Sequence, residues 1–181
     1  MMKDKIPRII DMIFNKGHIR IRSPFYIEKR MAEQSAPMTG RVRCVLTDVN
    51  TGKEEVHEVN NLIVTVCKNM VAARLAGEGN DCNITYGAVG TNNTAPAASD
   101  TTLGTELARK AVSLVSRSGN VVTCTTFFST TEANGAIKEV GMFGQAASAT
   151  PDSGTMINRT LISFTKSSSQ TLSIQGTFTI N

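Results

Sequence analysis

Apolar residues alternate with serine and threonine through three C-terminal segments, and this period of two constrains the fold more than any other feature of the sequence. The segments are 136–144, 155–166 and 170–180. Successive residues of a strand face opposite sides of a sheet, so the alternation gives each segment one apolar and one polar face. This pattern is typical of a half-buried antiparallel sheet. It predicts a chain built on β-strands.

Five further strand-like runs precede these segments, with turn residues between them. Residues 41–64 form two alternating runs around the turn Asn50–Lys53, which predicts a hairpin. Shorter runs follow at 83–90, 106–117 and 120–130. Seven or eight short strands with turns between them predict an all-β fold, an antiparallel β-sandwich or jelly roll.

One segment departs from the strand pattern and predicts a single short helix. In residues 65–79 the apolar side chains approximate one helical face. Thr65 stands where it could cap the helix, and Gly77 or Gly79 could end it. We expect this helix to pack on the end or face of the sheet.

Charge divides the chain into two parts. The net charge is +4, and residues 1–39 hold eight Lys or Arg and four acids, while residues 40–181 hold eleven of each sign. The length of 181 residues suits one compact domain with an appendage. We therefore predict a basic N-terminal attachment arm over 1–39 and a β-sandwich domain over 40–181. The excess charge, with acids interspersed, is weak beside that of nucleic-acid-binding arms, so nucleic acid is not the expected partner.

The arm is too short to bury its own apolar residues, so we expect it to lie on a neighbouring protein. Residues 6–17 read as a short helix, with Pro7 near its start and Gly17 at its end. Residues 18–30 read as an extended strand that could add to a partner's sheet edge, while the helix could enter a groove. The predicted contact residues are Ile9, Ile10, Ile13, Phe14, Ile19, Arg20, Ile21, Arg22 and Phe25.

The glycine-rich stretch Tyr86–Leu107 does not fit a phosphate-binding loop. Such a loop needs a lysine after its last glycine, and Asn92 stands there instead. Gly87 and Gly90 lie within a strand pattern, where glycine marks a bulge or a close backbone approach. We predict a long surface loop whose Thr, Ser and Asp side chains satisfy its backbone locally.

The residues that could carry catalysis form no convincing set. His57 lies on a predicted hairpin strand, and Ser167–Ser169 form a turn rather than a nucleophile elbow. Glu132, Glu139 and Asp152 could approach one another as glycosidase carboxylates do, but the chain has no Trp to stack on a sugar. We expect no enzymatic activity and no cofactor.

The cysteines point to packing rather than to metal. Cys44, Cys67, Cys82 and Cys124 include no C-x-x-C pair, and the chain has two histidines, so zinc-ligand spacing is lacking. They read as small apolar side chains in a reducing compartment, with an oxidised pair in an assembled particle as the alternative.

No segment of the sequence reads as a membrane span or a signal peptide. The first apolar run, IIDMIF, is short and carries Asp11 in its middle. No stretch approaches the roughly 20 apolar residues that a spanning helix needs. We expect synthesis in a host cytoplasm and no membrane partner.

Four stretches together resemble a β-rich domain that recurs in virion proteins of tailed bacteriophages, in tail-fibre, collar and baseplate-associated proteins. They are NNLIVTVCKNMVAARL, ITYGAVGTNNTAPAASDTTLGTELAR, FFSTTEANGAIKEVGMFG and GTMINRTLISFTKSSSQTLSIQGTFTI. The resemblance covers about residues 60–181, carries no catalytic residue or cofactor, and leaves the arm outside it. It implies that the loop 86–107 crosses from one sheet of a sandwich to the other.

From the resemblance and the arm we expect a non-enzymatic structural component of a virion, at a collar, tail fibre or baseplate. Other virion structural proteins would be its partners, and it would form a homo-oligomer, a trimer or a higher ring. A capsid decoration protein is one alternative. A receptor- or carbohydrate-binding module is the other, although such modules usually expose more aromatic side chains than Tyr26 and Tyr86.

Overall fold

A computed structural model describes residues 12–15, 18–21, 38–78 and 81–181 of the chain. It contains two compact units, Met1–Ala36 and Pro37–Asn181, which we call the arm and the body. The described part of the arm holds strands β1 (Met12–Asn15) and β2 (His18–Ile21). The described part of the body holds β3 (Met38–Asp48), β4 (Glu54–Ile63), α2 (Thr65–Leu75), β5 (Ile84–Gly90), β6 (Glu106–Ser118), β7 (Val121–Phe128), β8 (Gly135–Gly144), β9 (Thr155–Lys166) and β10 (Gln170–Ile180).

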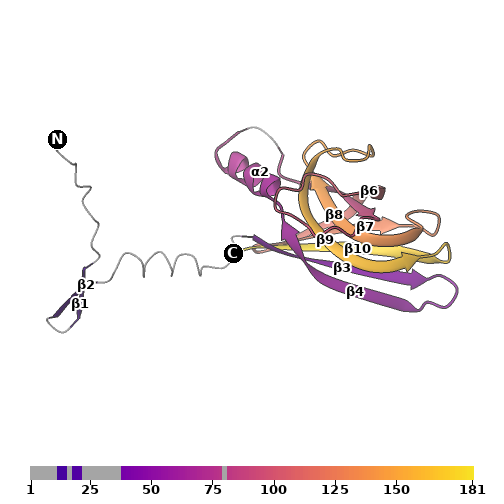
Figure 1. Ribbon diagram of the computed structural model, residues 1–181, viewed down its shortest axis with the longest axis horizontal. Helices are drawn as coiled ribbons and strands as arrows, with labels where there is room; N and C mark the ends of the chain where they lie inside the picture. The colour runs from indigo at the N-terminus through magenta and orange to yellow at the C-terminus, as the bar shows by residue number, and fades with distance from the viewer. Residues whose placement is uncertain (1–11, 16–17, 22–37, 79–80) are drawn as a thin grey trace. The chain divides into compact units, whose positions relative to one another are not determined.

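The eight strands of the body close into an antiparallel barrel in the order β10-β3-β4-β9-β8-β5-β6-β7 (Figure 1). The prediction of a β-sandwich or jelly roll is therefore wrong, although the all-β class with one short helix is right. The last strand decides the architecture. β10 pairs with β3 along one edge and with β7 along the other, so it joins the first body strand to the middle of the chain.

Closure removes sheet edges, which would otherwise expose unpaired backbone groups. It is uneven around this barrel. β10 and β3 pair over their full lengths, from Gln170–Asp48 to Ile180–Met38. β4 and β9 pair only through Leu62–Arg159 and Ile63–Asn158. Farther along that seam, the rings of His57 and Phe164 stack with centroids 4.9 Å apart, so a side-chain contact joins the two strands where the ladder is missing.

The predicted hairpin over residues 41–64 is confirmed as β3 and β4. The Asp48 carboxylate accepts hydrogen bonds from the backbone N–H groups of Asn50 at 3.0 Å and Thr51 at 2.9 Å. Gly52 takes a positive φ of 69°, which an L side chain rarely adopts. The turn residues thus fix the hairpin locally, before any packing is considered.

The predicted helix is also confirmed, as α2, but its N-terminal cap differs from the prediction. Val64 is the N-cap and supplies no side-chain hydrogen bond, while the N–H of Thr65 donates to the carbonyl of Ala98 at 2.8 Å. The C-terminus follows the sequence signal. Gly77 has φ +77°, and the N–H of Glu78 donates to the Ala73 carbonyl at 2.9 Å, as in a Schellman motif.

The barrel interior is filled by alternating residues from strands far apart in sequence. Inward positions of the paired strands β3 and β10 lie side by side on the inner face and are almost fully buried. These positions are Val42, Cys44, Leu46, Leu172, Ile174 and Phe178. In Figure 1, α2, the start of β3 and the C-terminus lie toward one end of the barrel, and the β3–β4 turn lies at the other.

In the arm, Met12–Asn15 form strand β1, where the sequence pattern predicts part of a helix over 6–17. The remaining residues of that predicted helix, 6–11 and 16–17, lie outside the described residues. β2 at His18–Ile21 agrees with the extended conformation predicted for the start of 18–30, and residues 22–30 are not described.

Candidate functional site

The arm residues predicted to contact a partner fall partly within a β-hairpin. β1 and β2 pair in antiparallel register, with Met12 opposite Ile21, Ile13 opposite Arg20, and Phe14 opposite Ile19. Of the predicted contact residues, Ile13, Phe14, Ile19, Arg20 and Ile21 lie in this hairpin. Ile9, Ile10, Arg22 and Phe25 lie outside the described residues.

The register pairs residues of like chemistry at two of its four positions. Met12 lies opposite Ile21 and Phe14 opposite Ile19, and all four residues are apolar. At the other two positions Ile13 lies opposite Arg20 and Asn15 opposite His18. A two-stranded sheet is marginal in water by itself, so a hairpin of this composition favours a partner surface.

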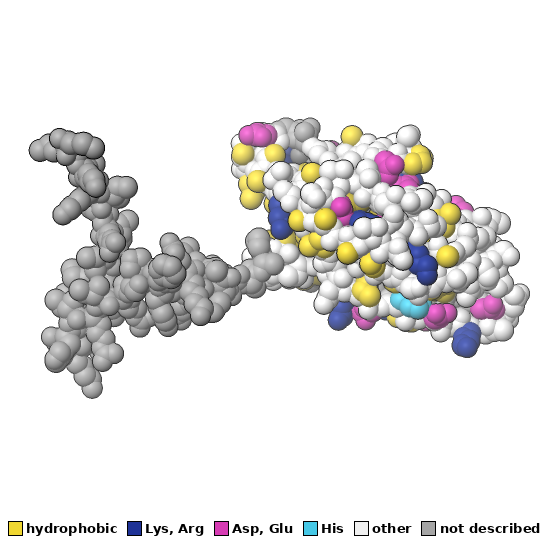
Figure 2. Space-filling view, in the orientation of Figure 1, with side chains coloured by type: hydrophobic (Ala, Val, Ile, Leu, Met, Phe, Trp, Pro, Cys, Tyr) yellow, Lys and Arg dark blue, Asp and Glu magenta, His cyan; other side chains and the backbone are white. Residues whose placement is uncertain are grey.

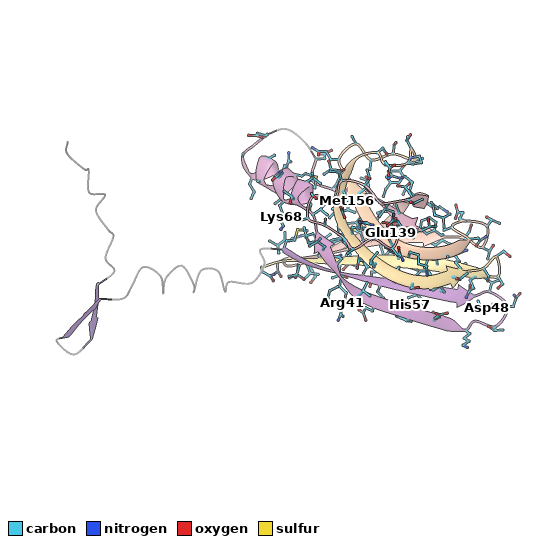
Figure 3. All side chains as sticks on the ribbon, viewed as in Figure 1. Arg41, Asp48, His57, Lys68, Glu139 and Met156 are labelled. Carbon is cyan, nitrogen blue, oxygen red and sulfur yellow. The ribbon has the colours of Figure 1, made fainter. Side chains whose placement is uncertain are left out.

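In the body, the glycine-rich loop is built around a buried carboxylate. Glu139 of β8 is fully buried and accepts hydrogen bonds from three backbone N–H groups, those of Gly104 (3.0 Å), Thr105 (2.9 Å) and Asn92 (3.3 Å). Figure 3 shows Glu139 inside the body, whereas Arg41 and Asp48 lie at its periphery. The carboxylate therefore ties both ends of the loop 91–105 to the outside of β8.

Arg159 of β9 balances this carboxylate and holds the middle of the loop. Its Nε donates to Glu139 at 2.7 Å, Nη1 donates to Asp100 at 2.8 Å, and Nη2 donates to the Thr94 carbonyl at 3.2 Å. Desolvation acts to raise the pKa of Asp100. Hydrogen bonds from the Ala97 amide and from Arg159 outweigh it, so this pKa lies below its usual value.

These contacts correct the expected path of the loop. β5 and β6 are neighbours in the barrel, so the loop returns to the same sheet rather than crossing between two sheets. Local side-chain bonds do support it, as predicted: Asp100 accepts from the Ala97 N–H at 2.9 Å and Asn92 from the Thr94 N–H at 2.6 Å. The pairing of β5 with β6 shifts register at Gly90. A Cβ added to Gly90 would lie 2.5 Å from Oε1 of Glu139, so there is no room for one.

A second buried ion pair anchors the neighbouring loop 145–154. The side chains of Arg109 and Glu106 are 2% and 4% exposed and join at 2.7 Å. Arg109 also donates to the Ser153 carbonyl at 3.0 Å and lies 4.6 Å above the Phe143 ring. Both loops therefore cover the outer face of the barrel through buried charges, as structural anchors.

The residues weighed as possible catalysts have separate partners. Glu132 binds Lys110 at 2.6 Å, and Glu139 binds Arg159. His57 contacts Glu55 at 2.7 Å and stacks on Phe164, while the Asp152 N–H contacts Glu106 at 3.3 Å. Ser167–Ser169 form the turn into β10, where Ser169 donates to Asp48 at 3.2 Å. None of these contacts joins two of the three carboxylates Glu132, Glu139 and Asp152 into a pair.

A cavity of about 450 Å³ opens at the end of the body that carries α2. Its walls come from the start of β3, α2, the start of β5, the second half of β6, the first half of β7 and the end of β10. Most of this lining is apolar. Five sulfur-containing side chains line it: Met38, Cys67, Met70, Cys82 and Cys124. Figure 2 shows hydrophobic side chains gathered at this end.

All four cysteines are free thiols, and Cys82 is exposed while the other three are buried. Burial raises the pKa of Cys67 and of Cys124 to about 11 and that of Cys44 to about 12. The three buried thiols therefore stay protonated near neutral pH and pack as small apolar groups, as predicted.

Within the described ranges, no three His, Cys, Asp or Glu side chains come together as a metal site would require. No described helix is both long enough and apolar enough to span a membrane. Comparisons of this chain with models of protein families, with curated proteins and with solved structures gave no match.

Two sites were missed at the level of sequence. In the sequence, Glu139 reads as a surface charge and Arg159 as a strand residue twenty positions further along. No local signal indicates that the two form a buried pair. The cavity joins strands and a helix across the whole body. The sequence carries one sign of this cavity: three of the four cysteines, which are dispersed along the chain, line it.

Proposed function

We propose that this chain is a non-enzymatic structural component of a tailed-bacteriophage virion, attached through its N-terminal arm. The virion assignment rests on the four sequence stretches within residues 60–181. The arm carries the whole excess of positive charge, while the body is neutral in sum. The arm would attach the chain at a collar, a tail fibre or a baseplate.

The observation that carries the attachment role is the register of the arm hairpin. It pairs the apolar residues Met12 with Ile21 and Phe14 with Ile19 in a two-stranded sheet. Full burial of each large apolar side chain contributes about 1.5–3 kcal/mol, so burying these four residues against a partner could stabilise a complex substantially. Docking by a hairpin replaces the helix-in-groove contact expected for residues 6–17.

The body supports the proposal in a different way. Its strands pair on both sides around the barrel, and its longest surface loop is tied down by Glu139 and Arg159. A domain of this kind is a rigid unit that suits a fixed place in a particle. Arginines of the arm, Arg20 and Arg22, would set register against acidic groups of the partner and add more to specificity than to affinity.

The test is incorporation into assembled particles. A chain lacking residues 1–30 should fold but be lost from purified virions, and so should a chain with the paired changes Phe14→Asp and Ile19→Asp. The matched control is Lys53→Ser, at an exposed turn of the body, which should incorporate normally. Normal incorporation of the truncated chain would refute the attachment role. Retained binding of that chain to cell-wall glycans would favour a receptor-binding module instead.

A further inference from the structure

The cavity at the α2 end of the body lies at the mouth of the barrel. Two buried barrel residues line it, Cys124 of β7 and Phe178 of β10, which are 0% and 1% exposed. The helix α2 is held beside this mouth, because the N–H of its N-cap Val64 donates to the carbonyl of Ile157 at 3.3 Å. The mouth of an eight-stranded barrel is a place where small ligands commonly bind.

The cavity is open because one strand extends past its neighbour. β6 pairs with β5 only through Ala111, whereas its pairing with β7 continues to Ser118. The β6 segment 112–118 therefore has no described strand partner on its β5 side. Val115 in this segment and Ile180 at the end of β10 line the cavity and remain 56% and 52% exposed. A ligand can therefore enter over an apolar rim.

The size and the charge of the cavity restrict what it can hold. Its volume of about 450 Å³ lies within the range of small-molecule sites, and an apolar cavity of roughly 150 Å³ already binds benzene. Among the described residues that line it, none is an Asp, Glu, Lys, Arg or His. A charged group would lose its hydration there without meeting an opposite charge, so the cavity selects a neutral ligand.

One polar atom of the lining calls for a hydrogen-bond partner. The hydroxyl oxygen of Thr85 is buried and has no hydrogen bond within the described part of the chain. The pairing of β5 with β8 shifts register between Ile84 and Tyr86, so Thr85 stands at an irregularity of the strand. Such irregularities re-aim side chains and are frequent beside functional sites. A ligand group that hydrogen-bonds this hydroxyl would remove the cost of leaving it unpaired.

We propose that the cavity binds a neutral aliphatic molecule with one hydrogen-bonding group, of the kind represented by a medium-chain fatty alcohol. The uncharged lining selects the neutral form, the volume sets the size, and Thr85 receives the polar group. Met38 and Met70 in the lining can adapt their shape to a flexible chain, whereas Phe178 is the one aromatic ring among the described lining residues. The proposal uses residues of the body alone, so it does not depend on the attachment role of the arm.

Calorimetric titration of the full-length chain with 1-octanol, 1-decanol and sodium decanoate at pH 8 tests the ligand class. We expect one alcohol to bind per chain. Each added CH₂ should tighten binding about fourfold while the aliphatic chain still fits, so 1-decanol should bind about 15-fold more tightly than 1-octanol. Decanoate has the same chain length but is ionised, and it should bind at least about tenfold more weakly than 1-decanol.

Two neighbouring residues of β6 provide a matched pair of variants that test the location. Val115 lines the cavity, whereas Leu114 is 62% exposed and is not among the lining residues. Val115→Trp should weaken the binding of 1-decanol at least about tenfold by obstructing the rim, and Leu114→Trp should change it less than about twofold. Both positions are exposed enough to leave the fold intact, which the melting temperatures of the ligand-free variants would verify.

Thr85→Val tests the hydrogen bond, because it removes the hydroxyl and keeps the shape of the side chain. It should weaken the binding of 1-decanol about fivefold. Binding of n-hexane, which has no hydrogen-bonding group, should stay within about twofold when followed by NMR. A variant that merely disturbed the cavity would weaken both ligands alike.

Four results would overturn the proposal. They are no saturable binding of 1-decanol up to its solubility limit, equal affinities for 1-decanol and decanoate, equal effects of Val115→Trp and Leu114→Trp, and unchanged 1-decanol affinity in Thr85→Val. None of them bears on incorporation into virions, so this proposal and the attachment role fail separately.

Discussion

The carboxylate of Glu139 lies 2.7 Å from the guanidinium Nε of Arg159 on the adjacent strand, and the two side chains are 0% and 4% exposed. Three loop N–H groups complete the carboxylate's hydrogen bonds, and Asp100 and a loop carbonyl complete those of the arginine. A buried charge is tolerated when it is paired and hydrogen-bonded in this way. The pair therefore binds loop 91–105 to the barrel wall.

Removing one charge of this pair should be strongly destabilising. Glu139→Gln replaces an acceptor oxygen with an N–H₂ group that faces other donors, and it leaves the guanidinium of Arg159 with Asp100 alone as its carboxylate partner. Breaking a buried pair costs about 3–5 kcal/mol, so we expect a loss of that size in urea unfolding. The control is Glu58→Gln at the exposed Arg41–Glu58 pair, where about 0–1 kcal/mol is expected. Equal losses from both variants would contradict the anchoring role.

Leu103 should hold the same loop by packing. It is 4% exposed, and one of its methyl groups lies 3.1 Å from the position that a Cβ on Gly141 would take. Leu103→Ala should cost about 2–5 kcal/mol, as buried large-to-small changes do. Leu107→Ala, at a residue 40% exposed, should cost well under half as much. Amide hydrogen exchange should show faster exchange across residues 91–105 in the first variant, and unchanged exchange there would argue against it.

Acid should weaken the fold partly through Glu132. Hydrogen bonds from Lys110 and from the Ser129 N–H lower the pKa of this carboxyl to about 2 from its usual 4.5. A carboxyl with a depressed folded-state pKa contributes stability above its unfolded pKa and loses it as pH falls through the folded value. The stability advantage of wild type over Glu132→Gln should therefore be full above about pH 4.5 and shrink toward pH 2. Melting temperatures across this range provide the measurement, and a constant difference would refute the assignment.

The body should fold without the arm. β3 begins at Met38, opposite Ile180 of β10, so a truncated chain beginning at Pro37 keeps every ladder of the barrel. We expect a cooperative melt within a few degrees of the full-length chain, because the core lies within this unit. An aggregated or non-cooperative product, with the full-length chain folded under the same conditions, would show that the arm is needed for folding.

Local chemistry was enough to predict the strands and the helix. Period-two alternation marks β3, β4 and β10 most clearly, because one face of each is more buried than the other. Gly52 and Gly77 were recognisable because both positions need a positive φ. These signals depend only on neighbours along the chain, so they can be read from the sequence without knowledge of the packing.

The arm shows where local chemistry is ambiguous. The run from Ile9 to Phe14 is short and apolar, and such a run fits both a helix and a strand. Helical spacing predicted a helix, yet Met12–Asn15 pair with His18–Ile21 instead. In a hairpin, each strand forms its hydrogen bonds with the other strand. The periodicity of one segment alone carries no information about those bonds.

The sequence by itself determined that this chain is built of antiparallel strands with one helix and a basic arm, since alternation, turn residues and charge are properties of consecutive residues. Only the tertiary structure decided that the sheet closes into a barrel. Alternation states that one face of β10 is buried, but not that its two edges meet both β3 and β7. The same holds for Glu139, whose burial is possible because Arg159 and the loop N–H groups converge on it from elsewhere in the chain.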